Sequence, residues 1–187
     1  MKEGIFEIPH FLSNEQCDRI IASCKPKIKK LNNLNGNREA YGTWLYRYDY
    51  MDICDIIDEL MESISLENEL PIINQEHLHV VNYLSGGGYK EHWDYFHDGD
   101  KISEICGNRV YSFLFYLNDD FTGGETFFPT FNRKVIPEKG KLLFWNNLNP
   151  DGSRKIESKH AGLPVKEGEK WIMTSWIREK PFFPHTH

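Results

Sequence analysis

His92 and Asp94 are the first residues of this sequence whose types and spacing favour chemistry. They stand two positions apart in YLSGGGYKEHWDYFHD, residues 83–98. Because side chains alternate along a strand, both would project from the same face. An imidazole and a carboxylate supply two ligands of a metal site, and a second histidine would complete a set that leaves positions open for oxygen chemistry on Fe(II). Alone the pair is a weak signal, since a His-Asp pair at a strand end is often a surface hydrogen bond.

A second segment, SKHAGLPVKEGEKWIMTSWI at residues 158–177, adds His160 and Lys170. If its last part is a strand, every second residue shares one face: Lys170, Ile172, Thr174, Trp176 and Arg178. A lysine on an inward face is costly unless it meets an anion, and a dicarboxylate cosubstrate would supply one. Singly, His160 could be a hydrogen-bonded loop residue and Lys170 a solvated edge residue. Together with the His-Asp pair, they favour a metal site beside an anion pocket.

The elements that must position these residues follow from hydrophobic periodicity. Ser13 and Gln16 have the spacing of a capping box, and the apolar stripe behind them predicts a helix that Pro26 ends or kinks. A second helix is expected from about Met51 to Ser65. The stretch from Leu31 to Trp44 begins with Asn-rich and Gly-rich sequence and is expected to form a mobile lid over the site.

From His77 onward, short aromatic and β-branched runs replace the helical pattern. They are HLHVVNYL, RVYSFLFYLN, GETFFPT, KLLFWNN and KWIMTSWI, and turns rich in Gly, Asn and Pro separate them. The expected fold is mainly β with flanking helices: a jelly-roll (double-stranded β-helix) core with N-terminal helices packed on it. One domain is expected over residues 1–187, helical over about 1–70 and with its β-core over about 71–180.

Composition limits the classes of function. The chain has 187 residues, of which 27% are charged, and a formal net charge of −6, which argues against a general phosphate-binding surface and a nucleic-acid partner. No apolar run approaches the ~20 residues that span a bilayer, and the N-terminus lacks the apolar core of a signal peptide. We therefore expect no membrane association and a cytoplasmic location. The four cysteines form no C-x-x-C pair and are expected to be free thiols.

Residues 76–178 resemble the prolyl 4-hydroxylase branch of the Fe(II)/2-oxoglutarate-dependent dioxygenases. The resemblance lies in the H-x-D pair, the distant histidine, and the lysine ten positions after it. The segments HWDYFHD and GGETFFP and the NPDG turn before HAG also resemble that branch. The resemblance implies three iron ligands, one residue for the 5-carboxylate of 2-oxoglutarate and two hydroxyls lining the same pocket: His92, Asp94 and His160; Lys170; Tyr83 and Thr126.

By the same resemblance, five residues line a groove for a proline-containing peptide: Arg38, Glu76, Tyr89, Arg109 and Trp176. The implied reaction is hydroxylation of a peptidyl proline, coupled to conversion of 2-oxoglutarate to succinate and CO2, with ascorbate as reductant. The sequence departs from the family pattern at Arg178, where a histidine is expected, and near Ala40, where the loop lacks the expected Ser and Thr.

The residues alone leave several alternatives open. The chain could hydroxylate a free amino acid or another small molecule on the same scaffold, or be a catalytically silent jelly-roll binding module. The ligand set would also accept a structural Zn(II) or Mn(II) ion. Tyr83, Tyr89 and Trp176 could be ordinary core aromatics, and Arg109 could pair with a surface carboxylate. The sequence does not determine the natural substrate or the oligomeric state.

Overall fold

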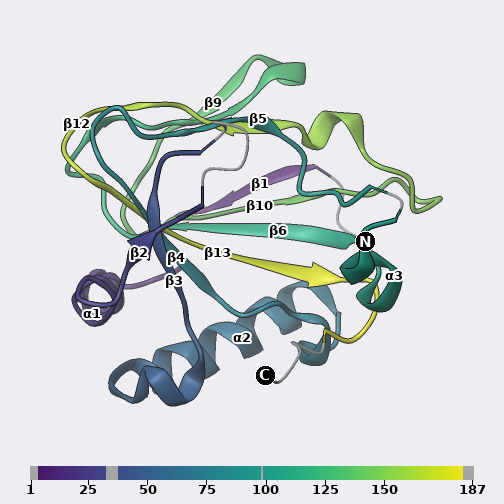
Figure 1. The fold of residues 1–187 in the computed structure, drawn as a ribbon, viewed down its shortest axis with the longest axis horizontal. Helices are drawn as coiled ribbons and strands as arrows, with labels where there is room; N and C mark the ends of the chain where they lie inside the picture. The colour runs from purple at the N-terminus through teal and green to yellow at the C-terminus, as the bar shows by residue number, and fades with distance from the viewer. Residues whose placement is uncertain (1–3, 33–37, 98, 183–187) are drawn as a thin grey trace.

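A large antiparallel sheet is the element on which the rest of the molecule is built. The computed structural model describes residues 4–32, 38–97 and 99–182. Seven strands form the sheet: β1 (Ile5–Ile8), β10 (Leu142–Asn146), β6 (Arg109–Tyr116), β13 (Lys170–Arg178), β4 (His79–Tyr83), β3 (Tyr41–Trp44) and β2 (Lys29–Lys30), in that spatial order. Helices α1 and α2 lie on one face of this sheet and shorter strands on the other (Figure 1).

Shorter strands form a second layer over the large sheet. Four of them pair in the order β5 (Tyr89–His92), β11 (His160–Gly162), β8 (Thr126–Phe128) and β9 (Arg133–Val135). A further pair joins β12 (Val165–Glu167) to β7 (Thr122–Gly123). All of these pairs are antiparallel. Two facing antiparallel sheets with flanking helices confirm the predicted jelly-roll fold class.

The helices begin and end largely where the sequence predicts. In α1 (Asn14–Cys24), Ser13 Oγ accepts from the Gln16 N–H, and the Gln16 side chain accepts from the Ser13 N–H, so the capping box is confirmed. Helix α2 (Cys54–Asn68) matches the second predicted helix to within a few residues. Helix α3 (Lys101–Cys106) was not predicted. Short 3-10 helices are η2 (Arg47–Asp49), η3 (Met51–Ile53), η4 (Ile72–Asn74), η5 (Pro129–Phe131) and η6 (Ile156–Ser158).

Two apolar clusters hold the layers together. One lies between the helices and the large sheet and includes Ile20, Ile56 and Met173; the other lies between the sheets and includes Val81 and Ile172. Within the first cluster, burial raises the pKa of Cys17 to about 11 and that of Cys24 to about 12, so both thiols stay protonated at pH 7. All four cysteines are free, as predicted.

The predicted lid is the main correction to the fold. Its C-terminal part, Tyr41–Trp44, is strand β3, whose residues pair with β4 in the large sheet. Residues 33–37 lie outside the described part of the chain. The N-terminal region therefore contributes β1, β2 and β3 to the large sheet in addition to its helices. Among the described residues, every helix is too short or too polar to cross a membrane.

Candidate active site

His92, Asp94 and His160 lie close together beside the paired strands β5 and β11. His92 ends β5 and His160 begins β11, and the two are direct partners across this antiparallel pair. Asp94 follows two residues after β5 ends. The Nε2 atom of each histidine lies 3.7 Å from a carboxylate oxygen of Asp94. The ligand atoms of the three side chains all lie within 4.8 Å of one another, which is a cluster of the size that holds one metal ion.

Backbone carbonyls orient both imidazoles of this cluster. His92 Nδ1 lies 2.8 Å from the carbonyl oxygen of Lys90, and His160 Nδ1 lies 2.9 Å from that of Ser158. Since a carbonyl can only accept, each Nδ1 carries a hydrogen, and in a neutral ring the lone pair is then on Nε2, the nitrogen that faces Asp94. Burial and the adjacent His160 lower the pKa of His92 to about 3, so this ring is neutral at pH 7.

Asp94 is the anionic member of the cluster and is 9% exposed. Burial raises the pKa of Asp94, but His160, His92 and Arg109 together outweigh that effect and hold the pKa well below its usual range. The carboxyl group is therefore ionised at pH 7. Two imidazole nitrogens and one carboxylate oxygen suit Fe(II) and related divalent ions, so the residues present fit the predicted metal.

Lys170 lines the same cavity as the metal cluster. The side chain is 2% exposed, and its Nζ donates to the carbonyl oxygen of Gly124 at 2.5 Å. Within residues 4–32, 38–97 and 99–182, no carboxylate forms an ion pair with Lys170. Burial lowers the pKa of this ammonium to about 7. A bound carboxylate would supply the missing counter-charge. Tyr83 and Thr126, the two hydroxyl residues predicted beside Lys170, line the same cavity.

Comparison with known proteins identifies the family. Residues 78–178 match the model of the 2OG-Fe(II) oxygenase superfamily. The chain belongs to this superfamily. It is 31% identical to prolyl 4-hydroxylase 13 of Arabidopsis thaliana, over 95% of this chain and 72% of that protein. It also matches the crystal structure of the viral collagen prolyl hydroxylase of Paramecium Bursaria Chlorella virus-1 in its 2OG complex, with a TM-score of 0.73 and 31% identity, over 93% of this chain and 95% of that one.

A Pseudomonas putida prolyl-4-hydroxylase shares the fold, with a TM-score of 0.72 at 20% identity over 95% of this chain and 94% of that one. These comparisons confirm the predicted resemblance: the chain is a prolyl 4-hydroxylase-like 2OG-Fe(II) oxygenase. Fe(II) and 2-oxoglutarate are accordingly its metal and cosubstrate.

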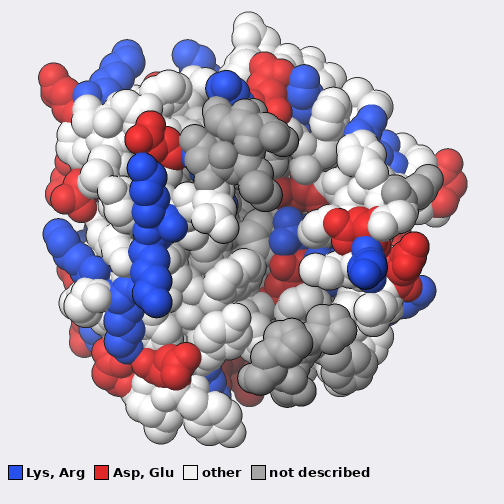
Figure 2. All heavy atoms as spheres, in the orientation of Figure 1, with Lys and Arg blue, Asp and Glu red and all other residues white. Residues whose placement is uncertain are grey.

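Three of the residues predicted to contact substrate line the cavity of this oxygenase: Arg38, Tyr89 and Trp176. Arg38 and Tyr89 form an isolated antiparallel bridge, and the Arg38 guanidinium lies 5.0 Å from the centre of the Tyr89 ring. The Tyr89 ring stacks on His92 with centroids 3.6 Å apart. The surface of the oxygenase is hollowed on the face shown in Figure 2, and charged side chains of both signs lie inside the hollow.

Glu76 and Arg109, also predicted to contact substrate, are instead paired with each other. Arg109 donates to both carboxylate oxygens of Glu76 at 2.7 Å, and Arg178 donates to one of them at 2.7 Å. Glu76 is 3% exposed, and neither it nor Arg109 is among the residues lining the cavity. Glu76 therefore has a buried ion-pairing role. Arg109 pairs with this interior carboxylate and not with a carboxylate at the surface.

Sequence reasoning missed four buried residues around the site: Ser112, Tyr116, Trp145 and Asn147. Ser112 Oγ donates to Asp94, and the Tyr116 hydroxyl lies 2.7 Å from Thr126 Oγ1. Within the strand RVYSFLFY, Ser112 and Tyr116 stand four apart and so share one face of the strand. That spacing was the available signal.

Proposed function

We propose that this oxygenase hydroxylates a proline residue within a peptide, using Fe(II) and 2-oxoglutarate. The observation that carries the proposal is one cavity whose walls include both a His-Asp-His cluster and the buried ammonium of Lys170. A metal centre and an anion site in one cavity are what binding of 2-oxoglutarate beside iron requires. The names of the relatives support the substrate class, since the plant and viral proteins are both called prolyl hydroxylases.

The proposed iron ligands are His92 Nε2, His160 Nε2 and one carboxylate oxygen of Asp94. When bound, iron and 2-oxoglutarate supply the oxidation: one atom of O2 enters a substrate C–H bond and the other enters succinate, with release of CO2. The carbonyls of Lys90 and Ser158 accept from the two Nδ1–H groups, which fixes both rings with Nε2 on the side of Asp94.

On the cosubstrate side, Lys170 is proposed to bind the far carboxylate of 2-oxoglutarate. The hydroxyls of Tyr83 and Thr126 line the same cavity and would donate to that carboxylate. Gly124 positions the lysine by accepting its hydrogen bond. Ascorbate is proposed as the external reductant, on family resemblance.

On the substrate side, Tyr89 and Trp176 present aromatic rings beside the metal cluster, and Arg38 presents a guanidinium. Aromatic side chains pack well on proline rings, and an extended polyproline II backbone leaves its carbonyls free to accept from arginine. Arg109 remains a candidate for contact with the peptide, because its side chain is 14% exposed and lies 3.7 Å from the Trp176 ring.

The test is succinate release by the purified protein with Fe(II) and 2-oxoglutarate, with proline-rich peptides, free proline or no substrate added. We expect peptides to stimulate succinate release and to gain one oxygen atom on proline by mass spectrometry. Asp94→Ala should abolish both signals. Glu91→Gln is the matched control, because Glu91 is close in sequence but pairs with Lys159 at 2.8 Å.

Three results would replace this proposal with its alternatives. Oxidation of free amino acids across a panel that leaves every peptide unmodified would make the chain a small-molecule hydroxylase. Absence of succinate under all conditions, with the metal bound, would make it a binding module. Tight Zn(II) or Mn(II) binding with no response to Fe(II) would make the cluster a structural site.

A further inference from the structure

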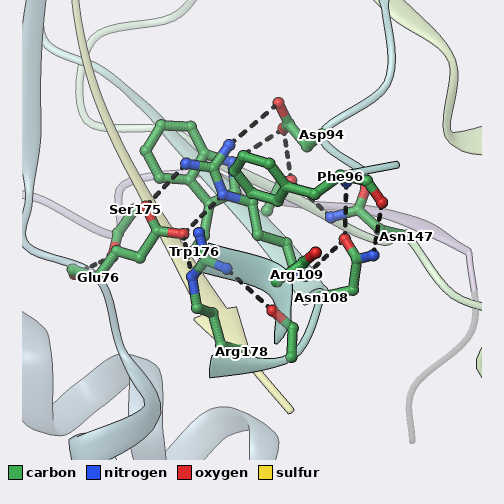
Figure 3. Close-up of polar contacts among 12 residues, drawn as sticks. Glu76, Asp94, Phe96, Asn108, Arg109, Asn147, Ser175, Trp176 and Arg178 are labelled. Atoms are coloured by element: carbon green, nitrogen blue, oxygen red, sulfur yellow. Dashed lines mark hydrogen bonds and ion pairs between the residues drawn. The ribbon is translucent and has the colours of Figure 1, made fainter. Parts of the chain in front are cut away.

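The two carboxylate oxygens of Asp94 have different surroundings (Figure 3). Oδ2 accepts two hydrogen bonds, from Ser112 Oγ at 2.6 Å and from Trp176 Nε1 at 2.9 Å. Oδ1 lies 3.7 Å from His92 Nε2 and 3.8 Å from Arg109 Nη1, and His160 Nε2 lies 3.7 Å from Oδ2; all three distances are beyond hydrogen-bond distance. Oδ1 therefore keeps its lone pairs for another partner, whereas Oδ2 is already engaged.

Asn147 fixes the direction of the hydrogen bond between Ser112 and Asp94. Asn147 Nδ2 donates to Ser112 Oγ at 2.8 Å, so the serine oxygen is an acceptor for Asn147 and must place its own hydrogen on Asp94. Ser112 is 1% exposed and Asn147 is 0% exposed. Buried hydrogen bonds of this kind to an ionised carboxylate are short and strong.

The tryptophan donor is held in place from its other side. The Arg109 guanidinium stacks 3.7 Å from the centre of the Trp176 ring, and Glu76 holds that guanidinium through both carboxylate oxygens. Arg178 in turn donates to Glu76. Arg178 thus places a second cation on the carboxylate that fixes Arg109. Figure 3 shows these side chains packed in one group beside Asp94.

We propose that Ser112 and Trp176 are positioning residues that hold Asp94 Oδ2 and leave Oδ1 as the single carboxylate ligand of the metal. The proposal rests on the proposed metal site. A carboxylate that binds through one oxygen occupies one coordination position rather than two, which preserves positions for exchangeable ligands. Trp176 also lines the cavity, so the same indole joins the substrate side of the site to the metal ligand.

The experiment measures the dissociation constant of Co(II), with no cosubstrate present, by anaerobic titration calorimetry and visible absorption. Ser112→Ala and Trp176→Phe each remove one donor to Oδ2. We expect each to weaken Co(II) binding about tenfold or more and to change the Co(II) absorption spectrum, as loss of a hydrogen bond to a ligand does. Ser112→Thr keeps the hydroxyl and should restore binding to within about threefold of wild type.

Two matched controls make the same chemical changes away from Asp94. Ser175 is also a buried serine, but it donates to the carbonyl oxygen of Glu76. Trp171 lies on the same strand as Trp176 and donates its indole N–H to Glu169. Ser175→Ala and Trp171→Phe should leave the Co(II) dissociation constant and spectrum unchanged, whatever they do to thermal stability.

The outcomes separate this proposal from the proposed function. If wild type binds Co(II) and Asp94→Ala does not, but Ser112→Ala and Trp176→Phe both bind as wild type does, the positioning roles are wrong and the metal site stands. If wild type itself binds no Co(II) or Fe(II), the proposed function fails first. Should Ser112→Ala fail to fold, Trp176→Phe decides alone, because Trp176 is only partly buried.

Discussion

Two buried lysines of this protein, Lys141 and Lys170, differ in the partners of their ammonium groups. Lys141 is 5% exposed and is paired with Glu7 at 3.1 Å and Glu138 at 2.6 Å. Lys170 is 2% exposed, and a backbone carbonyl is the partner of its ammonium group. Burying a charge without a counter-charge lowers stability, so the free protein carries Lys170 at a cost that a bound dicarboxylate would offset.

Replacing Lys170 with methionine should therefore separate stability from cosubstrate binding. Burial lowers the Lys170 pKa to about 7 in the folded protein, against an ordinary value of 10.5 in the unfolded chain. Between these pH values the unfolded chain binds more protons, so this lysine makes wild-type stability rise with pH from about 7 to about 10.5. Lys170→Met should be more stable than wild type at pH 7, and the difference should shrink towards pH 10, as measured by urea unfolding.

The same variant should raise the apparent KM for 2-oxoglutarate at least about tenfold, because it removes the cation that we propose binds the far carboxylate. Lys141→Met is the control, and it should lose stability at pH 7 because it removes the ion pair of Glu138 and one of the two ion pairs of Glu7, which keeps Arg133. Identical pH profiles of unfolding for wild type and Lys170→Met, or an unchanged KM, would contradict the role given to Lys170.

At the scale of elements, the sequence predicted those whose pattern is long and local. The apolar stripes of α1 and α2 and the β-branched runs of β4, β6, β10 and β13 were all readable. Strand β3 was not, because its pairing with β4 rather than its composition makes it a strand. Helix α3 was missed because six residues are too few to show a period, although Asp100 caps it.

The residues of the candidate site also divide into those that the sequence predicted and those that it did not. The H-x-D spacing and the distance from His160 to Lys170 are visible in one sequence, and the structure brings these four residues to one cavity. The partners of Asp94 come from β6 and β13, and nothing along the chain links them to residue 94. Glu76 was predicted to line the substrate groove, and its carboxylate pairs with Arg109, because resemblance indicates a position in a family and does not indicate where a side chain points.

The turn between β7 and β8 offers a test at this scale. Gly124 has a φ of +68°, and a Cβ added there would lie 3.0 Å from Lys170 Cδ and 2.9 Å from Phe121 Cε2. Gly124→Ala should lose about 1–2 kcal/mol of stability from the backbone strain and, in addition, raise the KM for 2-oxoglutarate several-fold by displacing Lys170.

Gly86→Ala is the control for the effect of backbone strain alone. Gly86 has a φ of +86°, and a Cβ there would meet nothing within 4 Å. Chemical denaturation should show a loss of stability in both variants, larger in Gly124→Ala because its Cβ also meets Phe121, while steady-state kinetics should show the KM effect for Gly124→Ala only. A normal KM in Gly124→Ala would mean that the turn does not set the position of the lysine.

At the scale of the whole molecule, the site is a product of the packing between the sheets. The large sheet supplies Lys170 and Trp176 from β13, and the second sheet supplies His92 and His160 from β5 and β11. Asp94 lies beyond β5 but hydrogen-bonds to β6 and β13. A metal held by these three ligands therefore connects the second sheet to a carboxylate that the large sheet anchors.

Metal binding should consequently stabilise the whole fold rather than one loop. A ligand that binds only the folded state adds about 2.7 kcal/mol at a concentration 100 times its Kd, and 1 kcal/mol shifts the Tm of a chain of this size by about 2–4 °C. Co(II) at that excess should thus raise the Tm of wild type by roughly 5–10 °C in a single cooperative transition, measured by circular dichroism. His160→Ala should lose this shift, whereas Glu91→Gln, whose carboxylate pairs with Lys159, should keep it. If Co(II) shifted only part of the thermal transition to higher temperature, the two sheets would be unfolding separately. The metal site would then not couple them.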